Sequence, residues 1–221
     1  ALSMFFIVIF EQIEQDIQLQ QEITEQRGKI AVLQMRPHFI HNTMTSIYYL
    51  CDQDPKKAQE VTMDFTTYLR KNFTAIASDH TIPFSEELEH TRAYLAVEQA
   101  QFDDMLFVDY DTPVTHFRLP PLTLQPLVEN AVKHGTSKKI GVSSLYISTR
   151  ESDAFYEIEI RDTGVGFDES IQLDDGRKHI GISNVRQRLE TLCNGTLTIE
   201  STPGVGTTAL IKIPKTEVYS K

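Results

Sequence analysis

Residues 129–135 read Glu-Asn-Ala-Val-Lys-His-Gly and close a segment whose apolar side chains recur at helical spacing. The apolar positions follow Pro120-Pro121 and are Leu124, Leu127, Val128 and Ala131. The pattern predicts a helix with Asn130, Lys133 and His134 at its carboxyl end. This polar helix end is the first candidate for a ligand site.

Three more clusters of polar residues and glycine follow this helix. They read Asp162-Thr163-Gly164-Val165-Gly166-Phe167 at the end of a predicted strand, Ile180-Gly181-Ile182-Ser183-Asn184-Val185-Arg186 at the start of a predicted helix, and Gly204-Val205-Gly206-Thr207-Thr208 between two predicted strands. One such cluster is often only a turn, but four in this order form a specific pattern. The chain has no GxxxxGK[ST] motif, which excludes a P-loop site.

The second half of the chain is predicted to hold both strands and helices. Alternating apolar residues predict strands at 106–110, 144–150, 155–161, 196–201 and 207–213. A further helix over 182–192 ends at Asn194-Gly195. Strands paired locally and interrupted by helices indicate an α+β domain, with an antiparallel or mixed sheet covered by helices on one face.

The first half is predicted to be helical. One apolar helix face is formed by Leu33, Ile40, Met44, Ile47 and Cys51. Asp54 and Pro55 then mark the turn into a second helix. The second helix points Val61, Phe65, Tyr68, Leu69 and Phe73 inward. One helical hairpin cannot enclose a core, so two hairpins from two chains are expected to form a four-helix bundle, as a homodimer. Ser85 begins a third helix.

Charge is distributed unevenly over the 221 residues, whose formal net charge is −10. Residues 1–111 hold 18 acidic and 8 basic side chains, and residues 112–221 hold 13 of each. The acidic half repels polyanions, so no nucleic-acid partner is expected, and an anionic ligand is expected in the neutral half. The two cysteines are too few for a disulfide framework or a zinc site, which favours a reducing compartment.

The sequence begins at Ala1 without an initiator Met, and residues 2–10 are strongly apolar. This run is about half the length that crosses a bilayer, and no basic segment precedes it as in a signal peptide. Two interpretations stay open, a helix end that packs on another surface and the last turns of a transmembrane or signalling helix. Residues 11–36 favour one long helix with a weak heptad pattern.

The four clusters resemble the nucleotide-binding motifs of the GHKL, or Bergerat-fold, ATPase superfamily, which includes histidine kinases, gyrase, Hsp90 and MutL. The resemblance implies that Asn130 is a Mg²⁺ ligand and that Asp162 accepts a hydrogen bond from the adenine amine of ATP. It also implies an ATP-binding set that lies around these two residues. That set is Lys133, His134, Gly135, Gly164, Gly166, Gly181 and Thr207. Residues 168–180 are then a lid over ATP.

The segment Leu33-Gln34-Met35-Arg36-Pro37-His38-Phe39-Ile40-His41-Asn42-Thr43 is similar to the phosphoacceptor region of sensor histidine kinases of the LytS type. That resemblance implies that His38 attacks the γ-phosphate of ATP. Histidine is largely neutral at pH 7, and a neutral ring nitrogen attacks without prior deprotonation. Helix spacing places Asn42 beside His38, where it is expected to hold the imidazole tautomer or the incoming phosphate.

Four positions depart from the common pattern of these families. His41 stands where the LytS-type segment commonly has Phe, and Phe39 stands where some kinases have a carboxylate that acts as the base. Pro126 stands where several members of the superfamily carry a catalytic or metal-binding polar residue. His179 stands where the lid usually has the first glycine of a GxG motif. The general base therefore has no certain candidate, and Glu129 is considered only because it adjoins Asn130.

The sequence thus predicts the catalytic core of a membrane-anchored bacterial sensor histidine kinase with three parts. Residues 1–32 are a signalling or coiled-coil helix, 33–83 a dimerising phosphotransfer hairpin, and 84–221 an ATP-binding domain. The expected partners are a second copy and the receiver domain of a response regulator. The core is expected to be a soluble fragment on the cytoplasmic side of the membrane, anchored by the segment before residue 10. Two alternatives are a GHKL-fold ATPase without kinase activity and a degenerate nucleotide-binding scaffold.

Overall fold

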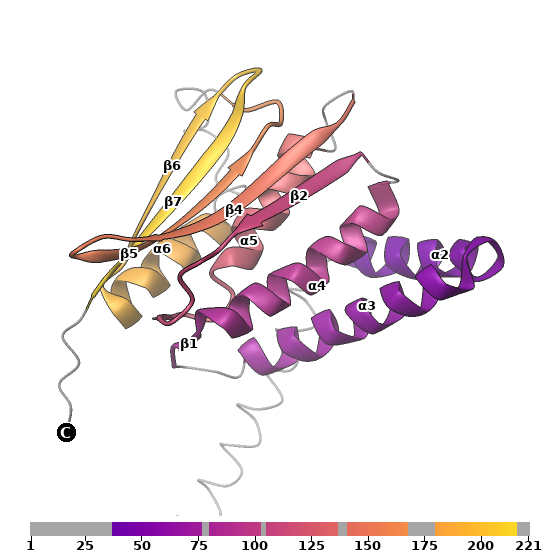
Figure 1. Cartoon of the computed structure of the whole chain (residues 1–221), viewed down its shortest axis with the longest axis horizontal. Coiled ribbons are helices and arrows are strands. Elements are labelled where there is room, and N and C mark those ends of the chain that lie inside the picture. Colours follow the sequence, from indigo (N-terminus) through magenta and orange to yellow (C-terminus); the bar gives the residue numbers. More distant parts are fainter. Residues whose placement is uncertain (1–36, 77–79, 103–104, 137–140, 168–179, 216–221) are drawn as a thin grey trace, which may run out of the picture.

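The computed structural model describes residues 37–76, 80–102, 105–136, 141–167 and 180–215 (Figure 1). The expected helix over residues 1–32, all but the last residue of the expected lid over residues 168–180, and the side chain of Phe73 lie outside the described part. No helix among the described residues is long and apolar enough to cross a membrane. The fold is α+β, as the sequence predicts.

Five strands form a mixed sheet in the carboxyl-terminal part. They are β2 (Leu106–Asp111), β4 (Ser143–Glu151), β5 (Phe155–Asp162), β6 (Thr196–Thr202) and β7 (Gly206–Pro214), in the spatial order β2-β4-β5-β7-β6. β2 is parallel to β4, and the other neighbouring pairs are antiparallel. Alternation along each strand sends every second side chain to the same face of the sheet.

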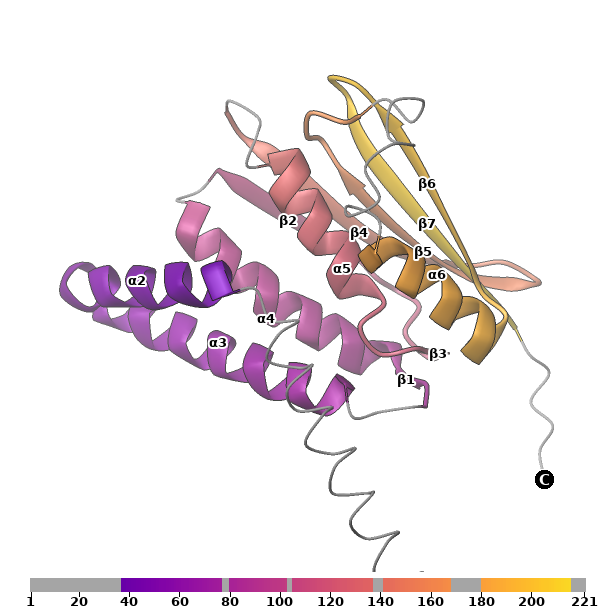
Figure 2. The same cartoon turned by 180° about the vertical axis from the view of Figure 1, so that it is seen from behind.

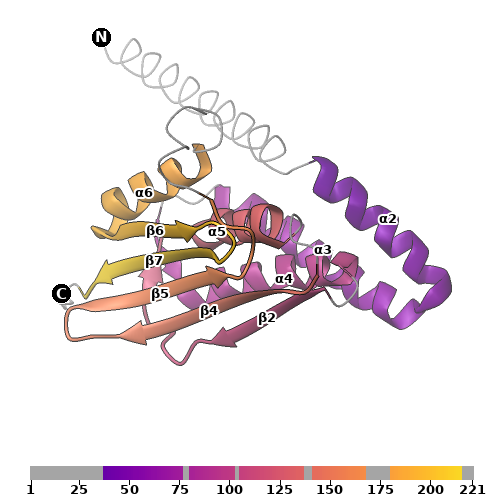
Figure 3. The same cartoon turned by 90° about the horizontal axis from the view of Figure 1, so that it is seen from above.

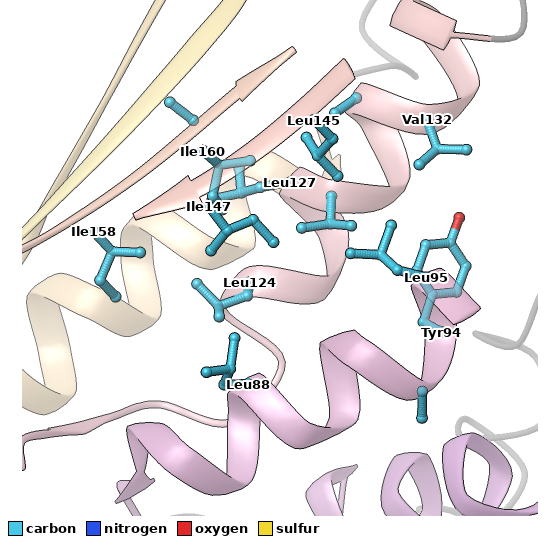
Figure 4. Packing of buried hydrophobic residues seen from close by; sticks show 14 of the residues in the cluster. Leu88, Tyr94, Leu95, Leu124, Leu127, Val132, Leu145, Ile147, Ile158 and Ile160 are labelled. Atoms are coloured by element: carbon cyan, nitrogen blue, oxygen red, sulfur yellow. The ribbon is translucent and has the colours of Figure 1, made fainter. Parts of the chain in front are cut away.

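Helices cover one face of this sheet (Figures 1 and 3). They are α4 (Phe84–Phe102), α5 (Leu124–Asn130) and α6 (Ile180–Cys193). Leu145, Ile147, Ile158 and Ile160 point from β4 and β5 to these helices and are at most 2% exposed (Figure 4). Burying each such side chain stabilises the fold by about 1.5–3 kcal/mol. The sequence alternation therefore fixes which face of the sheet is covered.

The amino-terminal hairpin is formed by α2 (Pro37–Gln53) and α3 (Pro55–Ile76) and packs on α4 (Figures 1 and 2). Asp54 is the predicted N-cap of α3, and its Oδ1 accepts the Lys57 N–H at 3.0 Å. Because α4 packs on the hairpin and on the sheet layer, it is buried on two sides. A short ribbon of β1 (Ile82–Pro83) and β3 (Arg118–Leu119) adjoins its start.

The apolar face of α2 that the sequence marks is largely exposed in a single chain. Within one chain, α2 buries Phe39 and Thr43 against the rest of the hairpin and α4. Met44 is 57% exposed and Cys51 is exposed, while Ile40 and Ile47 are half-buried. The predicted apolar stripe is therefore left largely open by a single chain.

A buried carboxylate from α4 caps the start of α5. Glu87 is 1% exposed, and its two oxygens accept the N–H groups of Leu122 at 3.0 Å and Leu124 at 2.9 Å. Leu124 is the first residue of α5, and Leu122 precedes the N-cap position, Thr123, whose own side chain makes no capping hydrogen bond. Leu122 adopts φ = 56°, a left-handed conformation that costs a Leu free energy and is held by this contact.

We expect Glu87→Ala to lower the free energy of unfolding by about 3–5 kcal/mol, because it leaves buried N–H groups without an acceptor. Glu87→Gln keeps one side-chain oxygen and should lose less. Urea unfolding of the two variants and the wild type measures the difference. Equal stability of Glu87→Ala and the wild type would contradict this role.

His90 on α4 is 2% exposed and lies against the ring of Tyr68, with the ring centroids 5.5 Å apart. Burial, with a smaller contribution from the charge of Lys71, lowers the pKa of His90 from 6.5 to about 4. The Lys71 ammonium lies 2.6 Å from a carboxylate oxygen of Glu89, so charge sits close to this histidine. Between pH 6.5 and pH 4, the unfolded chain thus takes up a proton that the folded chain excludes.

The stability of the wild type should therefore fall as the pH is lowered through this range. The contribution of His90 between pH 7 and pH 5 is about 2 kcal/mol. His90→Leu should remove this contribution and flatten the dependence of unfolding free energy on pH. Parallel profiles for the wild type and the variant in urea unfolding would show that His90 is not responsible.

Candidate functional site

Asp162 is the last residue of β5 and is 5% exposed. Alternation along β5 places its side chain on the same face as Ile158 and Ile160, which is the face that the helices cover. Its Oδ1 accepts the N–H of Gly164 at 2.8 Å, so the turn that follows the strand holds the carboxylate in place. A carboxylate only accepts hydrogen bonds, so this buried group suits a ligand that offers an N–H donor.

The turn between β6 and β7 packs directly on the segment that carries Asp162. Gly206 has φ = 135°, and a Cβ there would lie 2.0 Å from the carbonyl oxygen of Asp162. Gly166 has φ = 60°, and a Cβ there would lie 2.0 Å from the carbonyl oxygen of Thr202. The backbone N–H of Gly204 donates to the Val165 oxygen at 2.7 Å. Both glycines are required by this close backbone packing alone.

Asn130 ends α5, and the chain continues as a π-helix, η1 (Ala131–Thr136). A π-turn is rare and is found most often at functional sites. η1 contacts β4, β5 and β7, so it lies on the covered face of the sheet near the carboxyl end of β5. Asn130 is half-buried and Lys133 is exposed there. The side chains of His134 and Gly135 lie outside the described part.

The two remaining clusters join the same region. Thr207 pairs with Asp162 across β7 and β5, and its hydroxyl lies 2.9 Å from the Ser201 hydroxyl. Gly181 is the second residue of α6, and a Cβ on it would lie 3.9 Å from the Cβ of Pro126 on α5. The four sequence clusters are thus brought together on one side of the sheet, as a single ligand site requires.

His38 and Asn42 form a second candidate site, near the start of α2. His38 is exposed, and the Asn42 amide nitrogen lies 3.3 Å from His38 Nδ1. The structure therefore bears out the predicted neighbourhood of the two side chains. His41 is also exposed, one helix turn from His38. Both histidines are available to solvent within a single chain.

Phe39 explains why no carboxylate follows His38. Its ring is 8% exposed and packs edge-on against Tyr68, with the ring centroids 5.1 Å apart. It also packs at a tilt against Tyr94, with the ring centroids 5.3 Å apart. A charged side chain in this position would be buried without a partner. The position after His38 therefore belongs to the core that joins α2, α3 and α4.

The donor set at the first site fits a nucleotide with Mg²⁺. The carboxamide oxygen of Asn130 is a hard ligand of the kind that Mg²⁺ accepts along with phosphate oxygens and water. No group of three His, Cys, Asp or Glu side chains that could hold a metal occurs among the described residues. A protein cage for a metal is thus absent from that part, and phosphate oxygens would complete the coordination.

Two features of this region leave no signal in a local sequence pattern. The first is the π-helix after Asn130. The second is the hydrogen bond from Gln125 Nε2 on α5 to Tyr68 Oη on α3, at 3.1 Å. Positions 68 and 125 are 57 residues apart. Only the predicted burial of Tyr68 and the helical spacing of α5 hint at such a contact.

Known proteins resemble this chain in both sequence and structure. Residues 28–106 match the family model described as histidine kinase, and residues 121–217 match the model described as histidine kinase-, DNA gyrase B-, and HSP90-like ATPase. The uncharacterised protein YwpD of Bacillus subtilis strain 168 is 38% identical over 186 residues, covering 81% of this chain and 67% of YwpD. The sensor protein LytS of Oceanobacillus iheyensis is 34% identical over 171 residues, covering 72% of this chain and 29% of LytS.

The chain therefore spans two thirds of YwpD and less than a third of that LytS. A solved histidine kinase domain, from a blue-light activated histidine kinase of Erythrobacter litoralis, has a TM-score of 0.51 at 16% identity. The match covers 88% of this chain and 93% of that domain and shows a shared fold. With a histidine kinase match over the hairpin and α4, an ATPase match over the sheet domain, and LytS among its relatives, the chain belongs to the histidine kinases and carries the GHKL ATPase fold.

Proposed function

We propose that this chain is the core of a two-component sensor kinase that phosphorylates His38 with ATP and passes the phosphoryl group to an aspartate of a receiver domain. The observation that carries the proposal is the pair of candidate sites in one chain. A buried Asp162 lies among four converging clusters, and an exposed His38 is contacted by Asn42. An ATPase without an acceptor would need only the first site.

Each residue of the first site has a role in holding ATP. Asp162 accepts the adenine amine, while Gly164, Gly166 and Thr207 shape the turn beneath the base. Asn130 and Lys133, with His134 and Gly135, hold the phosphate end, and Gly181 presents the start of α6 to it. Mg²⁺, held by Asn130 and phosphate oxygens, supplies charge neutralisation when bound.

The transfer step forms one bond and breaks one. A ring nitrogen of His38 forms a bond to the γ-phosphorus, and the bond from that phosphorus to the bridging oxygen breaks, so ADP leaves with the electron pair. The Asn42 amide nitrogen lies 3.3 Å from Nδ1 and donates to it in this orientation, whereas the attack that we assign to Nε2 needs the ring proton on Nδ1. A half-turn of the Asn42 carboxamide presents its oxygen to Nδ1–H, which holds the tautomer that Nε2 needs before the proton is lost to solvent.

The open stripe on the hairpin supports a homodimer. Three large side chains on α2 are well exposed, Met44 at 57%, Tyr48 at 71% and Tyr49 at 62%, and Met63 on α3 is 66% exposed. Large apolar side chains exposed together on one helical hairpin are typical of an interface. A second hairpin would bury them in a four-helix bundle. The receiver domain of a response regulator is then a separate partner, and the segment before residue 10 leads to a membrane anchor.

One feature favours a degenerate nucleotide-binding scaffold instead. Phe39 occupies the place after His38 and is part of the core, so no adjacent carboxylate serves as a base. A scaffold would bind ATP at the first site and leave His38 unmodified.

The test is to incubate the protein with γ-labelled ATP and Mg²⁺ and to treat the labelled product with acid and with alkali. Phosphohistidine is lost in acid and retained in alkali, and this is the expected result. Nucleotide binding without label on the protein would favour the scaffold. Release of labelled phosphate from ATP without protein label would favour a simple ATPase.

A further inference from the structure

Gln125 joins the phosphoacceptor hairpin to the helix that ends at Asn130. It lies on α5, is 7% exposed, and uses both N–H groups of its carboxamide. One N–H donates to Tyr68 Oη on α3 at 3.1 Å, and the other donates to Glu129 Oε1 at 2.8 Å. Since the Glu129 carboxylate can only accept, the amide nitrogen is the atom that faces it.

On the hairpin side, this contact reaches the residue next to the acceptor histidine. Tyr68 is 2% exposed, and its ring packs edge-on against Phe39 at 5.1 Å between centroids. Phe39 follows His38 directly on α2. The position of the Tyr68 ring thus bears on the backbone that carries His38, because packed aromatic rings in a close-packed core have little room to move independently.

On the nucleotide side, the contact reaches Asn130. Glu129 is one helix turn after Gln125 and directly precedes Asn130, where the α-helix gives way to the π-helix. A hydrogen bond to Glu129 therefore fixes the last turn of α5 at the point where its backbone geometry changes.

Packing alone does not account for a glutamine in this place. The Gln125 Oε1 atom is buried and hydrogen-bonded by no described residue. A buried acceptor without a partner costs about 1–3 kcal/mol, so an apolar side chain of similar length would fill the space at lower free energy. The two N–H contacts are what the glutamine supplies.

We propose that Gln125 is a positioning residue for phosphoryl transfer. Through Tyr68 on one side and Glu129 on the other, it sets the Asn130 end of α5 relative to the hairpin segment that bears His38. Gln125 contacts neither nucleotide nor acceptor in this role. The inference rests on the proposed kinase function and names the contact that links its two sites.

Two variants break the link without removing bulk. Gln125→Met keeps the length of the side chain and removes both donors, and Tyr68→Phe keeps the ring against Phe39 and removes the hydroxyl. We expect each to lower kcat for phosphorylation of His38 about tenfold, because small misplacements of reacting groups have effects of this size or larger. The Kd for ATP should stay within about twofold, since the adenine contacts at Asp162 are untouched. The double variant should be no slower than either single one.

Gln101→Met is the matched control. Gln101 on α4 donates from Nε2 to the Thr43 hydroxyl on α2 at 3.1 Å, so it also ties the hairpin to the rest of the chain. It has no contact with α5 among the hydrogen bonds of the described residues, and its variant should keep kcat within about twofold of the wild type.

Rates are measured as phosphohistidine formed at saturating ATP and Mg²⁺, with nucleotide affinity measured separately, well below the unfolding temperature of each variant. Wild-type kcat in both Gln125→Met and Tyr68→Phe would overturn the proposal, as would an equal loss in Gln101→Met or a loss confined to ATP affinity. A wild type that forms no phosphohistidine refutes the kinase function itself, and the inference with it. An active wild type with unaffected variants refutes the inference alone.

Discussion

The His38→Gln variant is expected to take up no phosphoryl group from ATP, while it binds nucleotide as tightly as the wild type. His38 is exposed near the start of α2, and Asn42 is the neighbour that contacts its ring. Glutamine keeps the size and polarity of the position but has no nucleophilic ring nitrogen. The loss should therefore be complete rather than partial. Incorporation of label from γ-labelled ATP measures it, and equilibrium binding of a nucleotide analogue measures the retained affinity.

His41→Gln is the matched control, because His41 is an exposed histidine on the same helix one turn away. We expect it to be labelled at nearly the wild-type rate. Full labelling of His38→Gln together with loss of label in His41→Gln would move the acceptor to His41. Reduced labelling in both variants would instead indicate that phosphorylation depends on this face of α2 as a whole and not on the His38 ring alone.

The Asp162→Asn variant is expected to bind ATP about 100-fold more weakly than the wild type, without loss of stability on that scale. The carboxylate has two oxygens, and Oδ1 already accepts the Gly164 N–H at 2.8 Å. Asparagine has one oxygen, which cannot serve both this N–H and the adenine amine. Its NH₂ group would face one of these donors, and the mismatch is costly in a site that is 5% exposed.

Titration calorimetry with ATP measures the change, and thermal unfolding checks that the fold is kept. Asp153→Asn, in the exposed loop between β4 and β5, is a control for the loss of one negative charge on the same hairpin of strands. Wild-type affinity in Asp162→Asn would remove the adenine role from Asp162. An equal loss of ATP affinity in Asp153→Asn would show that the effect comes from the change in overall charge and not from a contact with adenine.

Much of the fold is predictable because its signals are local. Alternation in β4 and β5 gives both the strands and the covered face, and Asp54 with Pro55 marks the start of α3 as the structure has it. The end of α6 is also local, although Asn194 rather than Gly195 adopts the positive φ, at 51°. The parallel pairing of β2 with β4 is not predictable in this way, since alternation gives a strand but not its direction.

The candidate site likewise has contacts that the sequence predicts and contacts that it does not. Asp162, Gly206 and Thr207 converge because β5 pairs with β7, and the sequence marks both strand ends. The contacts of Glu87 with Leu122 and of Gln125 with Tyr68 join residues 35 and 57 positions apart, and no periodicity encodes them. Helical spacing marks the apolar stripe of α2, but it does not show that α2 buries Phe39 and Thr43 within one chain, because spacing does not say which partner covers which face.

The location of the phosphoryl group tests the central claim most directly. The wild-type protein is incubated with ATP and Mg²⁺, digested at alkaline pH to preserve phosphohistidine, and analysed by tandem mass spectrometry of the peptide that spans α2. We expect a single phosphoryl group on His38. A phosphoryl group on His41 or on any other residue, or an unmodified peptide from protein shown to bind ATP, would contradict this expectation.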